Sequence, residues 1–456
     1  MKRRWSLLAF SVVTMLTSAS TGAQQGVQPA KPAVKPVTKQ PAAAAVRGDW
    51  PQWHGPKRDN VSTETGLLRQ WGPDGPALAW QASGLGLGFS SLAITNGRIF
   101  TMGDHGTEQF IEALDAQSGA MLWKTKVGPS HEDEYGGPRS TPTVDGALLY
   151  AVGTEGDLVC LDTATGKEVW RRSLPKDFGG RMMSDWKFSE SPLVDGDRVI
   201  VTPGAREATL VALDKKTGKE VWRTATPDLG PAGRDGAAYS SVVISNGAGV
   251  KQYVQLLGRG VIGVRASDGK FLWNYNDVAN QVANIATPLV QGDYVFASTG
   301  YQTGSALVKL APSKSAGGGD GVTATQVYKL DGKTFQNHHG GYVLIGQHIY
   351  GGHGHRRGAP ICIDLTSGKV VWGGEGTKSE GTGSAAVTTA DNLLYFRYED
   401  GTMTLIEATP TGYQPKGRFK IPGVSRPSWS HPVVLNGKLY LREDDKLLVY
   451  NVSQSS

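Results

Sequence analysis

The residues best suited to metal chemistry lie in two short segments of the sequence. Residues 337–339 read NHH and residues 353–357 read HGHRR. A tight turn near Gly346-Gln347 would pair the two segments and gather their imidazoles. Imidazole nitrogens are common ligands of zinc and copper, so the candidate metal ligands are His338, His339, His353 and His355. Two alternatives stay open, because the sequence fixes no carboxylate beside them. One is hydrogen bonding to an anionic or sugar-like ligand, with Arg356 and Arg357, and the other is a plain loop cluster.

The elements that position these residues belong to an internal repeat. LDAQSGAMLW (114–123), LDTATGKEVW (161–170), LDKKTGKEVW (213–222) and IDLTSGKVVW (363–372) are copies of one unit, and RASDGKFLW (265–273) is a diverged copy. Other aromatic residues end weaker copies, namely Trp80, Tyr328 and Phe419. A period of roughly 40–50 residues is typical of propeller blades.

Between these copies, alternating apolar runs flank Asp-Gly or Asn-Gly, which are hairpin signals because both turn positions need positive φ. Each unit is therefore expected to form four antiparallel strands, A to D, with the aromatic residue on strand D. The sequence predicts an all-β, eight-bladed β-propeller. The last unit, near residues 430–450, lacks strand D. The segment around Trp80 is expected to supply that strand and to close the ring, which removes exposed sheet edges.

The D–A and B–C loops should share one face, and they differ from blade to blade where the other turns are stereotyped. Variable loops on a rigid scaffold commonly carry function. Small residues begin most A strands, but His431 stands at one such position and Glu190 just before another. The candidate ligand residues on this face are Arg139, Trp186, Glu190, Tyr239, Asn284, His339, Glu380, Trp429 and His431. The alternative is a satisfied polar network that plugs the channel.

The D-x-x-T-G-K-x-x-W unit resembles the tryptophan-docking repeat of eight-bladed quinoprotein (PQQ) dehydrogenases over most of residues 77–450. The opening DWPQWHGPKRDNVS (49–62) also resembles the lead-in of secreted propellers of that superfamily. The resemblance implies that the strand-D aromatic residue packs against the C–D turn of the neighbouring blade. The residues expected in this structural role are Trp80, Trp123, Trp170, Trp222, Trp273 and Trp372.

The same resemblance implies oxidation of an alcohol or sugar by PQQ with calcium, and Glu190 or Glu380 would then be the base. Several departures count against it: the sequence has no Cys-Cys pair, no calcium ligand set that can be placed residue by residue, and no long insertions. The chain also resembles the noncatalytic outer-membrane barrel-assembly lipoprotein, although it lacks that protein's lipobox cysteine. The sequence thus favours a noncatalytic scaffold that binds a small molecule or protein. The alternative is a PQQ-dependent dehydrogenase.

The N-terminal region predicts export. Residues 1–23 read as a signal peptide and residues 24–48 as a disordered Pro/Ala/Lys-rich linker. Residues 49–76 form a lead-in, and residues 77–456 form the propeller. Residues 1–48 hold seven basic residues and no acidic ones, so the remainder is close to neutral and gives no reason to expect a nucleic-acid partner. We therefore expect a periplasmic or extracellular monomer without a transmembrane segment.

Cysteine content excludes a disulfide scaffold, because the chain has only Cys160 and Cys362. Each precedes the aspartate of its C strand by two residues. This spacing places them in blades two and six, on opposite sides of the predicted ring. We expect two small core residues that do not pair.

Overall fold

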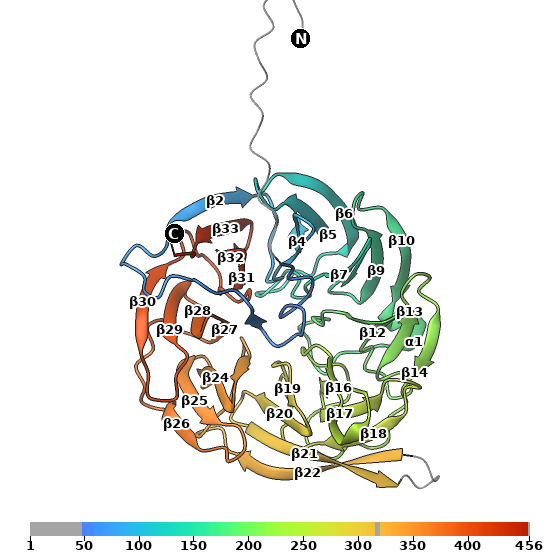
Figure 1. The fold of residues 1–456 in the computed structure, drawn as a ribbon. Coiled ribbons are helices and arrows are strands. Elements are labelled where there is room, and N and C mark those ends of the chain that lie inside the picture. Colours follow the sequence, from blue (N-terminus) through green and yellow to red (C-terminus); the bar gives the residue numbers. More distant parts are fainter. Residues whose placement is uncertain (1–47, 315–319, 455–456) are drawn as a thin grey trace, which may run out of the picture. The chain divides into compact units, whose positions relative to one another are not determined.

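The computed structural model describes residues 48–314 and 320–454, and these form a ring of eight four-stranded antiparallel sheets (Figure 1). Blade 1 contains β3 (Ala93–Thr95), β4 (Arg98–His105), β5 (Glu108–Asp115) and β6 (Met121–Pro129). Blade 2 contains β7 (Thr143–Asp145), β8 (Leu148–Val152), β9 (Asp157–Asp162) and β10 (Glu168–Ser173), followed by α1 (Leu174–Phe178). Blade 3 contains β11 (Leu193–Asp195), β12 (Arg198–Val201), β13 (Val211–Asp214) and β14 (Glu220–Arg223). Blade 4 contains β15 (Val243–Ser245), the 3-10 helix η1 (Gly247–Gly249), β16 (Gln252–Leu257), β17 (Gly260–Arg265) and β18 (Phe271–Tyr275).

The second half of the chain continues the pattern. Blade 5 contains β19 (Leu289–Gln291), β20 (Tyr294–Thr299), β21 (Gly304–Lys314) and β22 (Asp320–Leu330). Blade 6 contains β23 (Tyr342–Ile345), β24 (His348–His353), β25 (Ala359–Asp364) and β26 (Val370–Gly373). Blade 7 contains β27 (Ala385–Ala390), β28 (Leu393–Tyr398), β29 (Thr402–Glu407) and β30 (Pro415–Lys420). Blade 8 contains β31 (Val433–Leu435), β32 (Lys438–Glu443) and β33 (Lys446–Asn451), with β2 (Leu78–Ser83) as its outer strand.

The predicted ring closure is confirmed. Trp80 of β2 pairs with Val449 of β33, so the two ends of the propeller share one sheet. Eight clusters of buried apolar side chains lie between neighbouring sheets, one at each interface. At the closing interface, Ile99 of blade 1 belongs to the same cluster as Val433 and Val449 of blade 8. Burial between sheets therefore holds all eight blades, including the composite one.

The repeated aspartate explains the C–D turns. Asp162 Oδ1 accepts hydrogen bonds from the backbone N–H groups of Ala164 and Thr165 and from the Thr165 hydroxyl. Gly166 follows with a φ of +70°, and an added Cβ would meet the Trp123 indole of blade 1 at 2.6 Å. The turn therefore needs glycine both for its conformation and for the close approach of the indole.

Indole N–H groups tie several blades to the next. Trp123 donates to the carbonyl of Thr163 at 3.0 Å, and Trp170 donates to that of Lys215 at 3.0 Å. Trp372 donates to the carbonyl of Thr409 at 2.8 Å. The rings of Trp80 and Trp222 lie against the C–D turn glycines of the following blades, Gly119 and Gly269.

Trp273 departs from the expected role. Its indole donates to Gln252 Oε1 at 2.6 Å, within its own blade, and lies over Gly263 of the adjacent strand. The reason is that β21 and β22 are eleven residues long and stay paired as far as Lys314 and Asp320, so the described part of blade 5 places no C–D turn beside Trp273. At the next interface Tyr328 takes the tryptophan's place and donates to the carbonyl of Leu365 at 2.8 Å.

The lead-in crosses the centre of the ring (Figure 1, dark blue) and contacts the innermost strands of separate blades. Trp50 pairs with Ile94 of blade 1, and β1 (Val61–Ser62) runs parallel to β27 of blade 7. The Arg58 guanidinium donates to the carbonyls of Ser191 and Pro192 at the start of blade 3. The segment predicted only as a lead-in is therefore part of the propeller's centre.

The structure also bears on the predictions for the cysteines, the N-terminal region and a transmembrane segment. Cys160 lies in β9 and Cys362 in β25, and both are buried and free, which confirms that they do not pair. The predicted signal peptide and nearly all of the linker fall on residues 1–47, outside the described residues. Within residues 48–314 and 320–454, no helix is long and apolar enough to cross a membrane.

Candidate functional site

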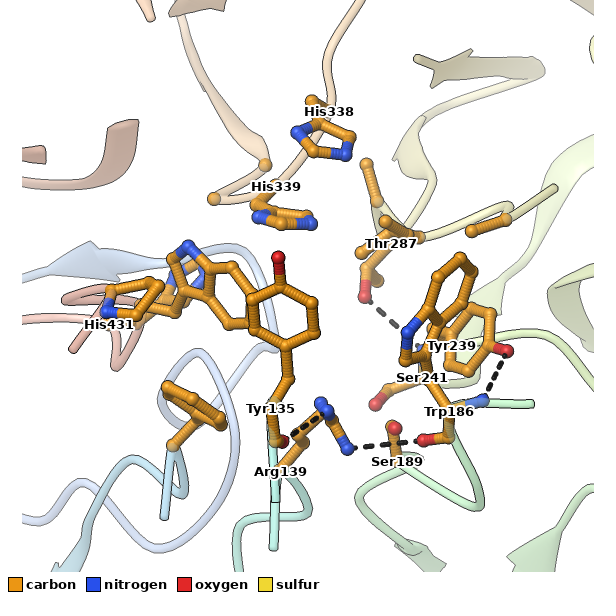
Figure 2. Close-up of a pocket in the computed structure, with 18 of the residues that line it drawn as sticks. Tyr135, Arg139, Trp186, Ser189, Tyr239, Ser241, Thr287, His338, His339 and His431 are labelled. Carbon is orange, nitrogen blue, oxygen red and sulfur yellow. Dashed lines mark hydrogen bonds between the residues drawn. The ribbon is translucent and has the colours of Figure 1, made fainter. Parts of the chain in front are cut away.

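A pocket of about 350 Å³ lies at the centre of the ring, on the side of the D–A and B–C loops (Figure 2). D–A loops supply most of its wall, B–C loops supply Tyr301, Arg356 and Glu399, and the lead-in supplies Trp53 and His54. Six of the nine predicted ligand residues line it: Arg139, Trp186, Tyr239, His339, Trp429 and His431. The lead-in residues Trp53 and His54 therefore form part of the pocket lining together with the loops.

The other three predicted ligand residues lie elsewhere. Glu190 is buried, where it accepts hydrogen bonds from the N–H and hydroxyl of Thr202. Burial raises its pKa to about 7, because little water remains to solvate the charge. Asn284 is also buried, and its amide donates to the carbonyls of Leu257 and Gly258.

Glu380, the other candidate base, is not among the residues that line the pocket. It forms an ion pair with Arg418 of β30 at 2.6 Å, and the Arg418 side chain is largely exposed. Neither candidate base is thus among the residues that line the cavity. Sequence position alone placed Glu190 and Glu380 in the correct loops but could not say which way their side chains turn.

The floor of the pocket comes from residues that sequence reasoning did not select. Trp53 stacks on His54 with ring centroids 4.0 Å apart, and His54 Nε2 is hydrogen-bonded to His431 Nδ1 at 3.1 Å. Burial lowers the pKa of both imidazoles, that of His431 to about 3, so this pair is neutral at physiological pH. The DWPQWHG sequence was the available signal, but nothing in it indicated that it enters the channel.

Two arginines line the pocket without an ion-pair partner among the described residues. The Arg139 guanidinium donates to the carbonyls of Trp186 and Tyr135, as Figure 2 shows, and no carboxylate lies within 4 Å of it in that part of the chain. Burial lowers the pKa of Arg139, but the group stays charged at neutral pH. Arg356 lies in the B–C loop of blade 6 with a φ of +56°, among the rings of Tyr135, Tyr301 and His355.

The predicted histidine cluster is only partly assembled. The rings of His338 and His339 stack at 3.7 Å, and that of His355 lies 4.1 Å from His338. His353 does not join them, because its ring stacks on Phe335 and accepts a hydrogen bond from the backbone N–H of Gln336.

A carboxylate that the sequence did not indicate takes the place of His353. Glu399 Oε1, from the B–C loop of blade 7, lies 3.4 Å from His339 Nδ1. Although burial raises the pKa of Glu399, the His339 imidazole lowers it on balance, so the carboxylate stays ionised. The neighbour was hidden because sixty residues and a whole blade boundary separate it from His339 in sequence.

Comparison with known proteins gives two groups of relatives. The chain is 30% identical over 139 residues to outer membrane protein assembly factor BamB of Kangiella koreensis, covering 30% of this chain and 31% of that protein. It is 26% identical over 209 residues to quinohemoprotein alcohol dehydrogenase ADH IIB of Pseudomonas putida, covering 42% of this chain and 27% of that enzyme. The chain therefore spans about a third or less of the length of these curated relatives.

Solved structures support the fold. BamB from Moraxella catarrhalis superposes with a TM-score of 0.57 at 14% identity, over 83% of this chain and 98% of that one. Quinohemoprotein alcohol dehydrogenase ADHIIG from Pseudomonas putida HK5 gives 0.60 at 14% identity, over 90% and 81%. A family model, PQQ_2, matches residues 107–374. Because this match covers more than half of the chain, the protein belongs to the PQQ_2 family, described as outer membrane protein assembly factor BamB.

Proposed function

We propose that this protein is an exported, noncatalytic propeller that binds a small anionic, ring-shaped molecule in the central pocket. The observation that carries the proposal is Arg139. The Arg139 guanidinium is half-buried, donates to two carbonyl groups and has no carboxylate partner within the described residues, so an anion in the pocket would compensate its charge. Arg356, which forms no ion pair within residues 48–314 and 320–454, adds a second cation to the pocket wall.

The rest of the wall supports a flat or sugar-like ligand body. Trp53, Tyr135, Trp186, Tyr239 and Trp429 present aromatic rings to the cavity. Such rings offer apolar faces together with polar edges, which suits a molecule that has both. The volume of about 350 Å³ falls at the lower end of the range for small-molecule pockets.

A catalytic role has weaker support. The quinohemoprotein alcohol dehydrogenases among the relatives keep quinone-dependent oxidation as the alternative. Such a reaction needs a free base at the substrate hydroxyl. Among the described pocket residues the carboxylate is Glu399, which is already engaged with His339, and Glu190 is enclosed by Thr202 and Gln255.

Calcium and PQQ also fit these residues poorly. Calcium takes six to eight oxygen ligands, commonly from several carboxylates. The described pocket lining offers one carboxylate, and its neighbours are imidazole nitrogens, which suit transition metals better. We therefore derive no reaction step through calcium or PQQ.

Family membership supports a second candidate, a protein-binding scaffold. The outer strands expose apolar side chains beside the repeated tryptophan, including Leu122, Val169 and Val221 at 47–48% exposure. A row of such residues around the rim is a suitable surface for a protein partner. A photo-crosslinker at Val169 should capture a defined partner that a crosslinker at the loop residue Lys187 does not. Equal capture of partners at Val169 and Lys187 would argue against the rim as a specific protein-binding surface.

The ligand proposal is tested with three sugars that share a ring and differ in charge. D-glucuronate, D-glucose and D-glucosamine are titrated into the full chain in EDTA, and the change in tryptophan fluorescence is followed, to which the pocket residues Trp53, Trp186 and Trp429 contribute. We expect affinity to fall in that order, because the arginines favour the anion and oppose the cation. Equal responses to glucuronate and glucosamine would contradict an anion-selective pocket.

A further inference from the structure

One wall of the pocket brings together three groups that can bind a metal ion. Within the described residues, His338, His339 and Glu399 each offer a ligand atom, and these atoms all lie within 4.8 Å of one another. A tetrahedral zinc site with bonds of about 2.0–2.1 Å needs ligand atoms roughly 3.4 Å apart. His339 Nδ1 and Glu399 Oε1 already have that separation, 3.4 Å.

Three buried polar atoms in this cluster make no hydrogen bond within the described residues. His339 Nδ1 and Glu399 Oε1 are buried atoms with no hydrogen-bond partner in the described part of the chain, and His355 Nδ1 beside them is a third. Unsatisfied buried polar atoms are rare in folded proteins, so three in one cluster call for an explanation. A cation bound between His339 and Glu399 would satisfy the first two of these atoms.

His338 is held as a metal-binding histidine usually is. One ring nitrogen is hydrogen-bonded to the Ser384 hydroxyl at 2.9 Å and the other to the Tyr301 hydroxyl at 3.1 Å. Whichever nitrogen binds the ion, the other keeps an oxygen partner that fixes the ring.

We propose that His338, His339 and Glu399 bind one zinc-type divalent ion on the wall of the pocket. Three protein ligands leave a coordination position open toward the cavity. Arg356, which also lines this wall, opposes the charge of the ion, and an anion bound between the two would relieve that repulsion. This last role, as an anchor for the anionic ligand, rests on the proposed function, whereas ion binding itself does not.

The test uses Co²⁺, a zinc substitute with visible absorption bands, and the full chain purified without a histidine tag. We expect one Co²⁺ per chain, displaced by Zn²⁺. E399Q and H339Q should each weaken binding at least ~10-fold, because each removes one of three ligands. H131Q is the matched control, since His131 lies near Asp133 and Glu155 in another loop and belongs to no metal-binding cluster of the described residues.

The outcomes are separable. Thermal unfolding confirms that each variant is folded, and a misfolded H339Q would leave E399Q, which preserves shape, as the deciding variant. Absence of a saturable Co²⁺ signal, or a wild-type signal in folded E399Q, would overturn the site. Because the titration contains no sugar and the sugar titration is done in EDTA, loss of one activity with retention of the other identifies which proposal has failed.

Discussion

The two faces of the ring obey different rules. On the turn face, Asp115, Asp162, Asp214 and Asp364 repeat the same contacts, and hydrogen bonds from a nearby Ser or Thr lower the pKa of each. On the loop face, the equivalent position three or four residues before each A strand holds a different residue in each blade, namely Phe89, Arg139, Ser189, Tyr239, Ile285, His339, Thr382 and Trp429. Residues that repeat from blade to blade are those that every blade needs in order to fold. Positions that differ from blade to blade are those where a binding site can form.

The largest expected effect tests whether the loop side also contains purely structural residues. Arg397 and Glu443 form a fully buried ion pair between blades 7 and 8, and Ser428 bonds to both. E443Q leaves the buried guanidinium uncompensated and should lower the free energy of unfolding by about 3–5 kcal/mol in urea titrations.

The matched control is E380Q, which removes a solvent-accessible partner of Arg418 on the same side of the ring. An exposed pair contributes about 0–1 kcal/mol, so this variant should unfold nearly as the wild type does. Similar losses in E443Q and E380Q would show that burial does not separate the two pairs.

The next effect concerns the turn face. Gly218 has a φ of +67°, and an added Cβ would meet the Trp170 ring at 2.7 Å. G218A should cost about 2–3 kcal/mol in unfolding free energy, from backbone strain and the displaced indole. Gly196 has a φ of +61° and open space around it, so G196A should cost only about 1 kcal/mol. If both variants lose the same amount, contact with the indole is not part of the glycine requirement.

The pH dependence of stability tests Glu190, whose pKa is raised by burial from 4.5 to about 7. Between these values the folded state keeps a proton that the unfolded chain releases, so the free energy of unfolding falls as pH rises toward 7. E190Q removes this contribution. Comparing urea unfolding at pH 5 and pH 8, we expect the wild type to lose about 1–2 kcal/mol more than E190Q. If the wild type and E190Q lose the same unfolding free energy between pH 5 and pH 8, a group other than Glu190 causes the pH dependence.

The smallest expected effect is on binding alone. R139Q removes the unpaired cation and should weaken glucuronate binding about tenfold, or roughly 1.4 kcal/mol, with little change in stability. R259Q is the control, because Arg259 pairs with Asp235 outside the pocket lining. Tryptophan fluorescence measures both. If R139Q binds glucuronate with wild-type affinity, the Arg139 guanidinium does not contribute to ligand binding.

The repeated residues also explain how much of the fold and of the candidate site could be predicted from the sequence. The D-x-x-T-G-K-x-x-W unit determined the blades, their order and the closure through Trp80, because local turn chemistry recurs with the fold. The predicted docking role of Trp273 is the exception, because the long strands β21 and β22 of blade 5 stay paired beyond the position where other blades turn. The site was predicted in part. Loop position located Arg139, Tyr239 and His339, but the approach of Glu399 and the entry of Trp53 depend on packing between distant segments.

The most direct test of the central claim, that the pocket binds rather than oxidises, is made with PQQ. The purified full chain is incubated with PQQ and Ca²⁺, and bound quinone absorbance is measured together with dye reduction in the presence of alcohols and sugars. We predict neither stoichiometric uptake of PQQ nor substrate-dependent dye reduction. Uptake of one PQQ per chain together with substrate-dependent dye reduction would contradict the account and establish a dehydrogenase.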